Sequence, residues 1–245
     1  MKPFLSVIIP AYNISKNFKE DALPQVASFL EDQKYTWEVI LVDDGSQDNT
    51  FDILSNFTKR HKDFFIKKIK HGGKAAAVMA GVMQASGEII LFTDFDQSTP
   101  IKEINKFIAE FKSGFDIVIA HRIREKKNDT IISLLRHRGF NLLVQLMALP
   151  GIPDTQCGFK AFRNTVAKDL FNSLSICKPS SDVKGPYMGA FDVELLFLAR
   201  RKGYKIKSVK VNWIRENSKN LTLFEPIKML WEITRIRLYY SLNLK

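Results

Sequence analysis

The chain has 245 residues, 45% of them hydrophobic, and carries a formal net charge of +11. This length and composition are typical of one large globular domain and exclude a largely disordered chain. The charge is concentrated at the end, where residues 200–245 contain twelve Lys or Arg against three Asp or Glu. That excess predicts an anionic partner, either nucleic acid or an acidic membrane face.

Neither the cysteines nor the apolar runs indicate a secreted or membrane-spanning protein. Cys157 and Cys177 have neither the spacing of metal ligands nor the density of a disulfide scaffold. The apolar run at the N-terminus is too short for a signal peptide. The run 142–149 is far shorter than the roughly 20 residues that span a bilayer. We therefore expect a cytoplasmic protein that is soluble or peripheral at the cytoplasmic membrane face.

Apolar runs bounded by turn residues alternate along the chain with helical patterns. The runs predict strands at 5–10, 37–43, 64–69, 89–93 and 115–120. At 205–213, lysines alternate with Ile206, Val209 and Val211, which predicts a half-exposed strand with a basic face. The helical patterns lie at 18–29, 75–85, 101–112, 131–149, 191–201 and 221–244. A further helix is predicted to begin after Asp48, which would be its N-cap. Because strand and helix alternate with short connections in the first half, we expect a mostly parallel α/β sheet flanked by helices.

Polar clusters follow three of the predicted strands. Tyr12 follows the first strand, Asp43 and Asp44 end the second, and Asp94 and Asp96 follow the fourth. The carboxyl ends of parallel strands meet at one edge of a sheet, and that edge is where open α/β sheets bind ligands. Two carboxylates one residue apart suit an oxygen-liganded Mg²⁺ or Mn²⁺ that also takes diphosphate oxygens. We therefore expect Asp94 and Asp96 to hold the metal of a nucleotide sugar, the alternative being a solvated acidic turn.

A glycine pair and a lysine follow the third predicted strand. In the segment His71-Gly72-Gly73-Lys74, the glycines let the backbone approach an anion and Lys74 supplies a cation. The chain has neither the G-x-G-x-x-G dinucleotide fingerprint nor the P-loop pattern. A nicotinamide-dependent oxidoreductase is therefore disfavoured.

The second half leaves several alternatives open. The segment 131–149 is either a core helix with a charged face or an interfacial segment whose arginines, Arg138 among them, meet a lipid phosphate. The tail 221–244 is basic, amphipathic and aromatic, so it either lies on a membrane surface or packs on the core. Asp192 and Glu194 open a helix, where acids also favour the helix dipole. A nucleic-acid-binding protein is the non-enzymatic alternative, and no helix-turn-helix, zinc or RNP pattern supports it.

The motifs in this chain resemble those of family 2 glycosyltransferases, and they occur in the family's order: SVIIPAYN, EVILVDDGSQDNT, GGKAAAVMAGVMQASGEIILFTDFD, GIPDTQCGFKAF, FDVELLFLA and VNW. The sequence is most similar to the branch of dolichyl-phosphate β-glucosyltransferases and polyprenyl-phosphate glycosyltransferases, from about Leu5 to Tyr239. The resemblance implies a GT-A (Rossmann-like) fold with C-terminal amphipathic interfacial helices. We expect one domain over 1–220, with a nucleotide-sugar half (1–100) and an acceptor half (101–220), followed by a basic amphipathic helix over 221–245.

The resemblance also implies an activity. Family members of this branch move a hexose, with inversion, from a nucleotide-diphosphate sugar to a polyprenyl monophosphate such as dolichyl or undecaprenyl phosphate, using Mg²⁺ or Mn²⁺. We expect UDP-glucose as the donor, with GDP-mannose as the alternative. The expected partners are these two substrates and a membrane surface, without nucleic acid, and the sequence predicts no particular oligomeric state. Because a phosphate monoester is already anionic at neutral pH, its oxygen needs no strong general base.

Roles for individual residues follow from the same resemblance. Asp96 and Asp94 would hold the metal, Arg122 and Arg138 would grip the acceptor phosphate, and Asp192 would orient sugar hydroxyls. The second-tier candidates are Asp154, also for sugar hydroxyls, with Gln156 and Lys219. The nucleotide would be bordered by Pro10, Ala11, Tyr12, Asp43, Asp44, Gly73 and Lys74. The sequence departs from the family pattern in three places. Ile14 replaces an acidic residue, the usual Asn-x-Gly-Lys-Gly appears as His71-Gly-Gly-Lys-Ala, and the residues after Trp213 read Ile-Arg-Glu-Asn-Ser-Lys.

Overall fold

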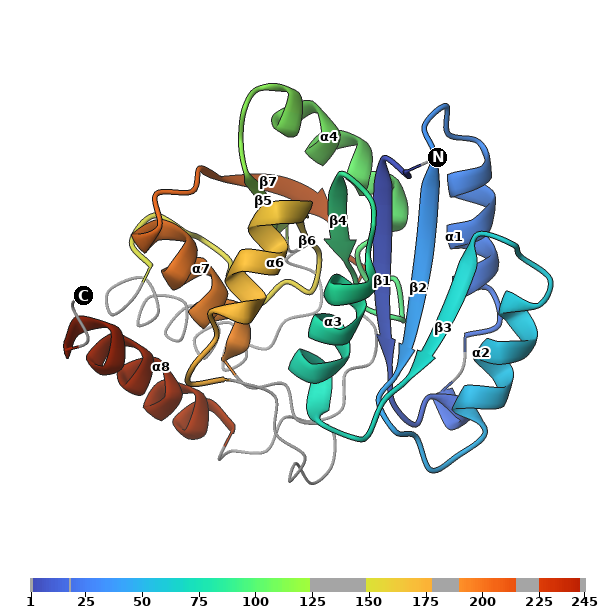
Figure 1. The fold of residues 1–245 in the computed structure, drawn as a ribbon, viewed down its shortest axis with the longest axis horizontal. Helices are drawn as coiled ribbons and strands as arrows, with labels where there is room; N and C mark the ends of the chain where they lie inside the picture. The colour runs from blue at the N-terminus through green and yellow to red at the C-terminus, as the bar shows by residue number, and fades with distance from the viewer. Residues whose placement is uncertain (1, 18, 124–148, 178–189, 215–224, 243–245) are drawn as a thin grey trace.

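The protein is described by a computed structural model that covers all residues except 1, 18, 124–148, 178–189, 215–224 and 243–245 (Figure 1). The described residues form one seven-stranded sheet with the strand order β3-β2-β1-β4-β6-β5-β7. Only β6 runs antiparallel to its neighbours, so the mostly parallel sheet that the sequence predicted is confirmed. The strands are β1 Leu5–Ala11, β2 Trp37–Asp43, β3 Phe64–Lys68, β4 Ile89–Phe92, β5 Ile117–Ile123, β6 Lys160–Arg163 and β7 Ile206–Asn212.

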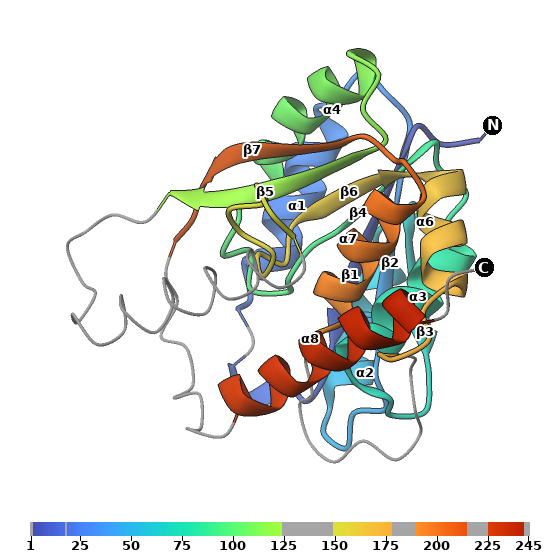
Figure 2. The same cartoon turned by 90° about the vertical axis from the view of Figure 1, so that its left-hand side faces the viewer.

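Helices cover both faces of this sheet. They are α1 Ala22–Glu31, α2 Thr50–Thr58, α3 Gly73–Gln84, α4 Ile104–Lys112, α6 Asn164–Asn172, α7 Phe191–Arg201 and α8 Glu225–Leu242, with short 3₁₀ turns at Ser15–Asn17 and Ile101–Glu103. Alternate residues of each strand face opposite sides. Ile8 of β1 therefore packs in the cluster with α3, α6, α7 and α8, whereas Val7 and Ile9 pack with α1 and α4. Figures 1 and 2 show the resulting three layers.

The predicted strands all occur, within a few residues of their expected ends. Two elements were not predicted, β6 and the helix α6 that follows it directly. β6 has only four residues and begins with a lysine, so its sequence shows no apolar alternation. The N-cap prediction was wrong by one residue, because Asn49 precedes α2 and Asp48 instead accepts a hydrogen bond from the Thr50 N–H. The predicted helix 131–149 lies outside the described residues, except for its last position.

The helix α8 packs on the core by one face. Ile233 and Ile236 are fully buried in the same cluster as α7, and the Tyr240 hydroxyl donates to Glu194 of α7 at 2.6 Å. Figure 1 shows α8 beside α7, at the end of the molecule away from α1 and α2. Another face, containing Trp231 and Leu238, is exposed to solvent. No helix in the described part of the chain is long and apolar enough to cross a bilayer.

Candidate active site

The loops after β1, β2, β3 and β4 meet at one edge of the sheet. The parallel registers set Ala11 beside Asp43, and Asp43 beside Lys68, so these strands end together. The loop after β4 reaches the loop after β3, because Lys74, at the start of α3, forms an ion pair with Asp94. The structure therefore brings together the polar clusters of the first half, as the parallel topology predicted.

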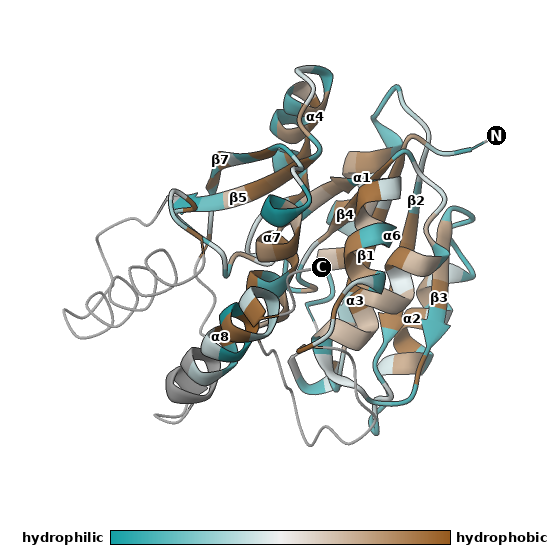
Figure 3. Cartoon of the chain, turned by 60° about the vertical axis from the view of Figure 1, so that its left-hand side comes forward, coloured by the Kyte–Doolittle hydropathy of each residue, from teal (hydrophilic) through white to brown (hydrophobic). Residues whose placement is uncertain are grey.

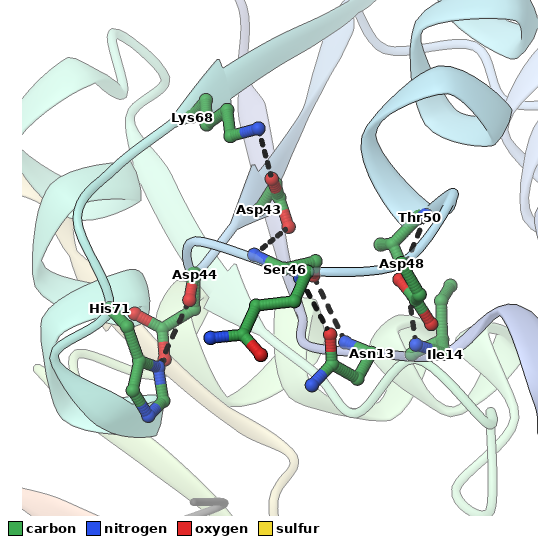
Figure 4. A network of polar contacts seen from close by, with 10 residues as sticks. Asn13, Ile14, Asp43, Asp44, Ser46, Asp48, Thr50, Lys68 and His71 are labelled. Atoms are coloured by element: carbon green, nitrogen blue, oxygen red, sulfur yellow. Dashed lines mark hydrogen bonds and ion pairs between the residues drawn. The ribbon is translucent and has the colours of Figure 1, made fainter. Parts of the chain in front are cut away.

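An aromatic pair and a carboxylate lie at the ends of β1, β2 and β3. The rings of Tyr12 and His71 stack with their centroids 4.1 Å apart. His71 Nδ1 lies 2.9 Å from Asp44 Oδ2 (Figure 4). The Gly72 N–H donates to Asp44 Oδ1. Burial raises the pKa of Asp44, although the Gly72 N–H and His71 act in the opposite direction. Flat rings beside a hydrogen-bonding group suit a nucleobase, which binds by stacking and through its polar edge.

The neighbouring positions shape this region through their backbone. Pro10 and Ala11 are the last residues of β1, and the Ala11 carbonyl accepts a hydrogen bond from the Asp44 N–H at 2.9 Å. Asp43 is fully buried and accepts from the Ser46 N–H, which closes the turn after β2 (Figure 4). Gly73 begins α3 with a φ of +82°, a conformation that L side chains rarely adopt. Pro10, Ala11 and Gly73 therefore place the loops through their backbone, and the Asp43 side chain holds the turn after β2.

Asp48 joins the loop after β1 to the start of α2. Its carboxylate accepts hydrogen bonds from Ser15 N and Oγ, at 3.1 and 2.6 Å, and from Thr50 N at 3.0 Å. The Thr50 hydroxyl in turn accepts from the N–H of Ile14 (Figure 4). Burial alone would raise the pKa of Asp48, but these hydrogen bonds outweigh it and lower the pKa to about 2. The folded protein thus favours the ionised form of this side chain.

This network predicts a pH-dependent part of the stability. The pKa of Asp48 is lower when folded than its unfolded value of about 3.9, so its contribution is complete above about pH 5 and is lost as the pH falls toward 2. We expect the difference in free energy of unfolding between wild type and Asp48→Asn to be constant above pH 5 and to shrink below it, measured by urea titration. The exposed Asp52→Asn should show no such trend. A difference that stays constant down to pH 2 would contradict the assignment.

The first carboxylate after β4 is held in a tight ion pair. Lys74 Nζ lies 2.5 Å from Asp94 Oδ1. The other side of Asp94 rests on Gly158, where an added Cβ would lie only 2.1 Å from Oδ2. Burial disfavours the charge of Asp94, but Lys74 and, to a smaller extent, Lys160 and Arg122 outweigh it and lower its pKa. Asp94 therefore remains ionised, and any side chain at position 158 would displace it.

The second carboxylate has fewer partners. Asp96 is partly exposed, and its Oδ1 accepts a hydrogen bond from the Ser98 N–H at 2.9 Å. Gln97, in the loop that carries Asp94 and Asp96, has a φ of +53°, which is unusual for a residue other than glycine. Its side-chain amide donates a hydrogen bond to the Asp94 backbone carbonyl. The Gln97 Oε1 atom is buried and has no hydrogen-bond partner among the described residues. An unsatisfied oxygen on the residue that follows Asp96 fits an oxygen-liganded cation.

These oxygens cannot form a complete metal site alone. Within the described ranges, no group of three or more His, Cys, Asp or Glu side chains is placed to hold a metal ion. Mg²⁺ takes six oxygens and usually keeps waters or substrate phosphates among them. The donor set at Asp94 and Asp96 therefore fits a cation whose remaining ligands come from a bound diphosphate and water.

The candidate acceptor residue Arg122 is held by a carboxylate. Its Nε and Nη2 atoms donate to Asp154 at 2.7 and 2.8 Å, and its guanidinium lies over the Trp213 ring. Burial opposes both charges, but the pairing outweighs it, raising the pKa of Arg122 and lowering that of Asp154. Gln156 donates its N–H to Asp154, and its buried Nε2 has no partner within the described structure. Two other candidates, Arg138 and Lys219, lie outside the described residues.

A buried lysine that sequence analysis missed lies behind these residues. Lys160 is fully buried, and its Nζ donates to Asp192 Oδ1 at 2.8 Å and to the Cys157 carbonyl at 2.5 Å. The candidate Asp192 thus has a partner on β6. One signal was available, because the lysine lies in an otherwise apolar run between Phe159 and Ala161.

Comparison with known sequences points to one family. The family model "Glycosyl transferase family 2" matches residues 6–171. A dolichyl-phosphate β-glucosyltransferase of Trichomonas vaginalis is 31% identical, covering 98% of this chain and 75% of its own. The Drosophila melanogaster protein of that name is 35% identical, and the match covers 90% of this chain and 70% of the relative. The Homo sapiens protein is 31% identical, and the match covers 96% of this chain and 75% of the relative.

Solved structures resemble the chain in fold. Glucosyl-3-phosphoglycerate synthase from Mycobacterium tuberculosis, in complex with Mn²⁺, UDP-glucose and phosphoglyceric acid, superposes with a TM-score of 0.65 at 18% identity, covering 97% of this chain and 79% of its own. Mannosyl-3-phosphoglycerate synthase from Rubrobacter xylanophilus superposes with a TM-score of 0.68 at 15% identity, covering 99% of this chain and 76% of its own. At such identities the similarity concerns the fold alone.

Proposed function

The chain belongs to glycosyl transferase family 2 and has the GT-A fold, and on that premise we propose that it transfers glucose from UDP-glucose to a polyprenyl phosphate. The observation that carries the proposal is the match to dolichyl-phosphate β-glucosyltransferases over 98% of the chain. The grouping of an aromatic pair, the partly buried Lys74 and two carboxylates at one sheet edge supports it. Such an edge is where α/β sheets bind nucleotides.

We assign the nucleotide to the first half of this edge. Tyr12 and His71 would offer the base a flat surface, with Asp44 as an acceptor for its polar edge or for the ribose. Lys74 would move from Asp94 to the diphosphate, because a dianionic group attracts the ammonium more strongly than one carboxylate does. His71 stands where relatives usually have Asn, so this position is a candidate for differences in donor affinity.

The metal would lie at the carboxylates after β4. Asp96 and Asp94, with the Gln97 amide oxygen nearby, would hold Mg²⁺ or Mn²⁺. A bound divalent cation neutralises the charge that develops on the departing diphosphate. Asp94 also helps to keep Lys74 charged: burial lowers the pKa of that lysine, but the carboxylates of Asp94 and Asp192 together outweigh burial and raise it.

The acceptor phosphate would enter beside Arg122, with Arg138 as a second cation. An oxygen of the phosphate monoester attacks the anomeric carbon, the bond to the diphosphate breaks, and UDP leaves from the opposite face, so the anomeric configuration inverts. Asp154 fixes the guanidinium plane of Arg122 by two hydrogen bonds. Asp192 would bind hydroxyls of the transferred sugar, and Gln156 and Lys219 complete the candidate set. Positioning and charge compensation would supply most of the rate enhancement.

The test is a direct assay of product formation. Purified protein with Mg²⁺ and a short polyprenyl phosphate is incubated separately with UDP-glucose, UDP-N-acetylglucosamine and GDP-mannose, and lipid products are identified by mass spectrometry. We expect a glucosyl phospholipid from UDP-glucose, abolished by EDTA. Product from GDP-mannose alone would replace the donor assignment, and no product from any donor would overturn the proposed function.

The exposed face of α8 suits a membrane surface. Trp231, Leu238 and Leu242 are 60%, 55% and 80% exposed, and they follow one stripe of the helix together with Arg235. The Arg235 guanidinium lies 4.6 Å from the centroid of the Trp231 ring. Figure 3 shows apolar and polar residues intermixed on this helix. Aromatic, aliphatic and cationic groups on one stripe match the headgroup region of an anionic bilayer.

We expect Trp231→Ser/Leu238→Ser to weaken binding to vesicles containing phosphatidylserine by roughly 100-fold, because each large side chain contributes about 1.5 kcal/mol or more when buried. Co-sedimentation measures this binding. Both side chains are exposed, so the thermal unfolding midpoint should not change. The matched control is Phe65→Ser, at a 43% exposed phenylalanine on β3. Equal vesicle binding by the double variant and wild type would exclude this surface.

A further inference from the structure

A lysine at the centre of the sheet has no role in the function proposed above. Lys160 is the first residue of β6, where it lies in register between Phe92 of β4 and Ile119 of β5. Its side chain is fully buried. Lysine is almost never fully buried unless it is paired, because removing an ammonium from water costs several kcal/mol. The contacts of Lys160 therefore need an explanation.

The ammonium of Lys160 is compensated by three groups from different parts of the fold. Asp192, in the first turn of α7, accepts from Nζ at 2.8 Å. The Cys157 carbonyl accepts at 2.5 Å, and the Phe92 ring centroid lies 5.5 Å away. Asp192 is itself only 4% exposed. The pair thus connects α7 to β6, directly behind the loop that carries Asp94.

This pair interacts with the ion pair at the front of the site. Burial lowers the pKa of Lys74, but the carboxylates of Asp94 and Asp192 outweigh it. Lys160 is in turn among the cations that stabilise the charge of Asp94. The two ion pairs, Lys74 with Asp94 and Lys160 with Asp192, therefore influence each other electrostatically. Removing Lys160 would leave Asp192 without its hydrogen-bonded cation.

Stability alone does not account for this arrangement. A buried ion pair is often no more stabilising than apolar residues of the same volume, and Phe159, Ala161 and Phe162 show that an apolar residue would suit this run. The pair does fix one carboxylate in position, because Asp192 is bound from the sheet side and lies on a packed helix. Precise placement is what a group that binds a substrate hydroxyl requires.

We propose that Lys160 is a positioning residue that holds the Asp192 carboxylate in place to accept a hydrogen bond from a hydroxyl of the donor sugar. This inference rests on the proposed function, since it needs a sugar nucleotide at the neighbouring edge. Lys160 does not touch the substrate and acts through Asp192. Its removal should therefore affect the sugar and not the nucleotide.

The experiment compares Lys160→Met, Asp192→Asn and the double variant with wild type. Lys160→Met keeps the length of the side chain and removes its charge. We expect each single variant to lower kcat by about 50-fold or more, with KM for UDP-glucose changed much less. The double variant should be within threefold of Asp192→Asn, because Lys160 has no effect once its partner is changed. Losses that multiply in the double variant would overturn the proposal.

The matched control is Lys202→Met, which breaks the surface ion pair with Asp169 and should leave kcat unchanged. Lys160→Met leaves a buried carboxylate unpaired and can fail to fold. The double variant removes that charge, so its kcat relative to Asp192→Asn then decides: an equal value supports the proposal, and a further tenfold loss overturns it. A folded Lys160→Met with wild-type kcat also overturns it.

Binding separates this inference from the proposed function. If wild type forms no product, the proposed function fails, and calorimetry with UDP and UDP-glucose still tests Lys160. We expect the preference of wild type for UDP-glucose over UDP to fall by the same factor in Lys160→Met and Asp192→Asn, with the affinity for UDP unchanged. An unchanged preference, or a loss of affinity for UDP itself, would show that Lys160 does not act on the sugar.

Discussion

We expect Asp96→Asn to lower kcat/KM for glucose transfer by about 1,000-fold, equivalent to about 4 kcal/mol of transition-state stabilisation. The substitution keeps the shape of the side chain and removes the negative charge that a divalent cation needs. Asp96 is partly exposed, and its carboxylate accepts a hydrogen bond from the Ser98 N–H, which an amide oxygen can also accept. The thermal unfolding midpoint should therefore stay within about 2 °C of wild type.

The measurement is initial rate against Mg²⁺ concentration, with UDP affinity measured separately. Wild type should bind UDP more tightly with Mg²⁺ than in EDTA, and Asp96→Asn should lose that difference. The exposed Asp52→Asn on α2 controls for a general change of charge. A variant that retains both wild-type activity and metal-dependent binding of UDP would show that the cation is held elsewhere.

Lys74→Met should lower kcat by about 100-fold and weaken UDP binding about tenfold, since the substitution removes the cation nearest Asp94 while keeping the apolar stem. The larger effect on kcat is expected because the negative charge on the diphosphate increases as the sugar departs. Asp94 retains Lys160 and Arg122 nearby, so the loop after β4 should keep its structure.

Steady-state kinetics with UDP-glucose and calorimetry with UDP check this expectation together. Lys70→Met is the control, because that lysine is exposed on the segment just before α3. Lys74→Arg should recover part of the activity if charge is the main contribution. If Lys74→Met weakens UDP binding but keeps the kcat of wild type, Lys74 stabilises only the bound substrate and takes no part in the departure of UDP.

The strands that the sequence predicted show a pattern within their own residues. β1, β2 and β4 are largely buried, which favours a nearly continuous apolar run. β6 could not be predicted in this way, because it pairs with β4 and β5 and contains a buried lysine. Its extended conformation depends on partners that are distant in the chain, as the context dependence of strand formation implies.

The same distinction applies to the acids at the start of α7. By sequence, Asp192 and Glu194 are equally consistent with a favourable effect on the helix dipole. In the structure, Glu194 accepts hydrogen bonds from the N–H groups of three consecutive residues, Ser175 to Cys177, and from the Tyr240 hydroxyl. Asp192 instead pairs with Lys160. One acid therefore anchors neighbouring backbone, and the other belongs to the candidate site.

The amino-acid order was sufficient to predict the α/β class, the family and the edge at which Tyr12, Asp44, Asp94 and Asp96 gather. Periodicity and strand direction are local properties, and parallel strands necessarily bring their carboxyl ends to one side. The partner of each charge could not be obtained in this way. Lys74 with Asp94, Arg122 with Asp154 and Lys160 with Asp192 are separated by 20, 32 and 32 residues, and each pair forms because the fold brings the two side chains together. A buried charge such as that of Lys160 requires a partner of this kind.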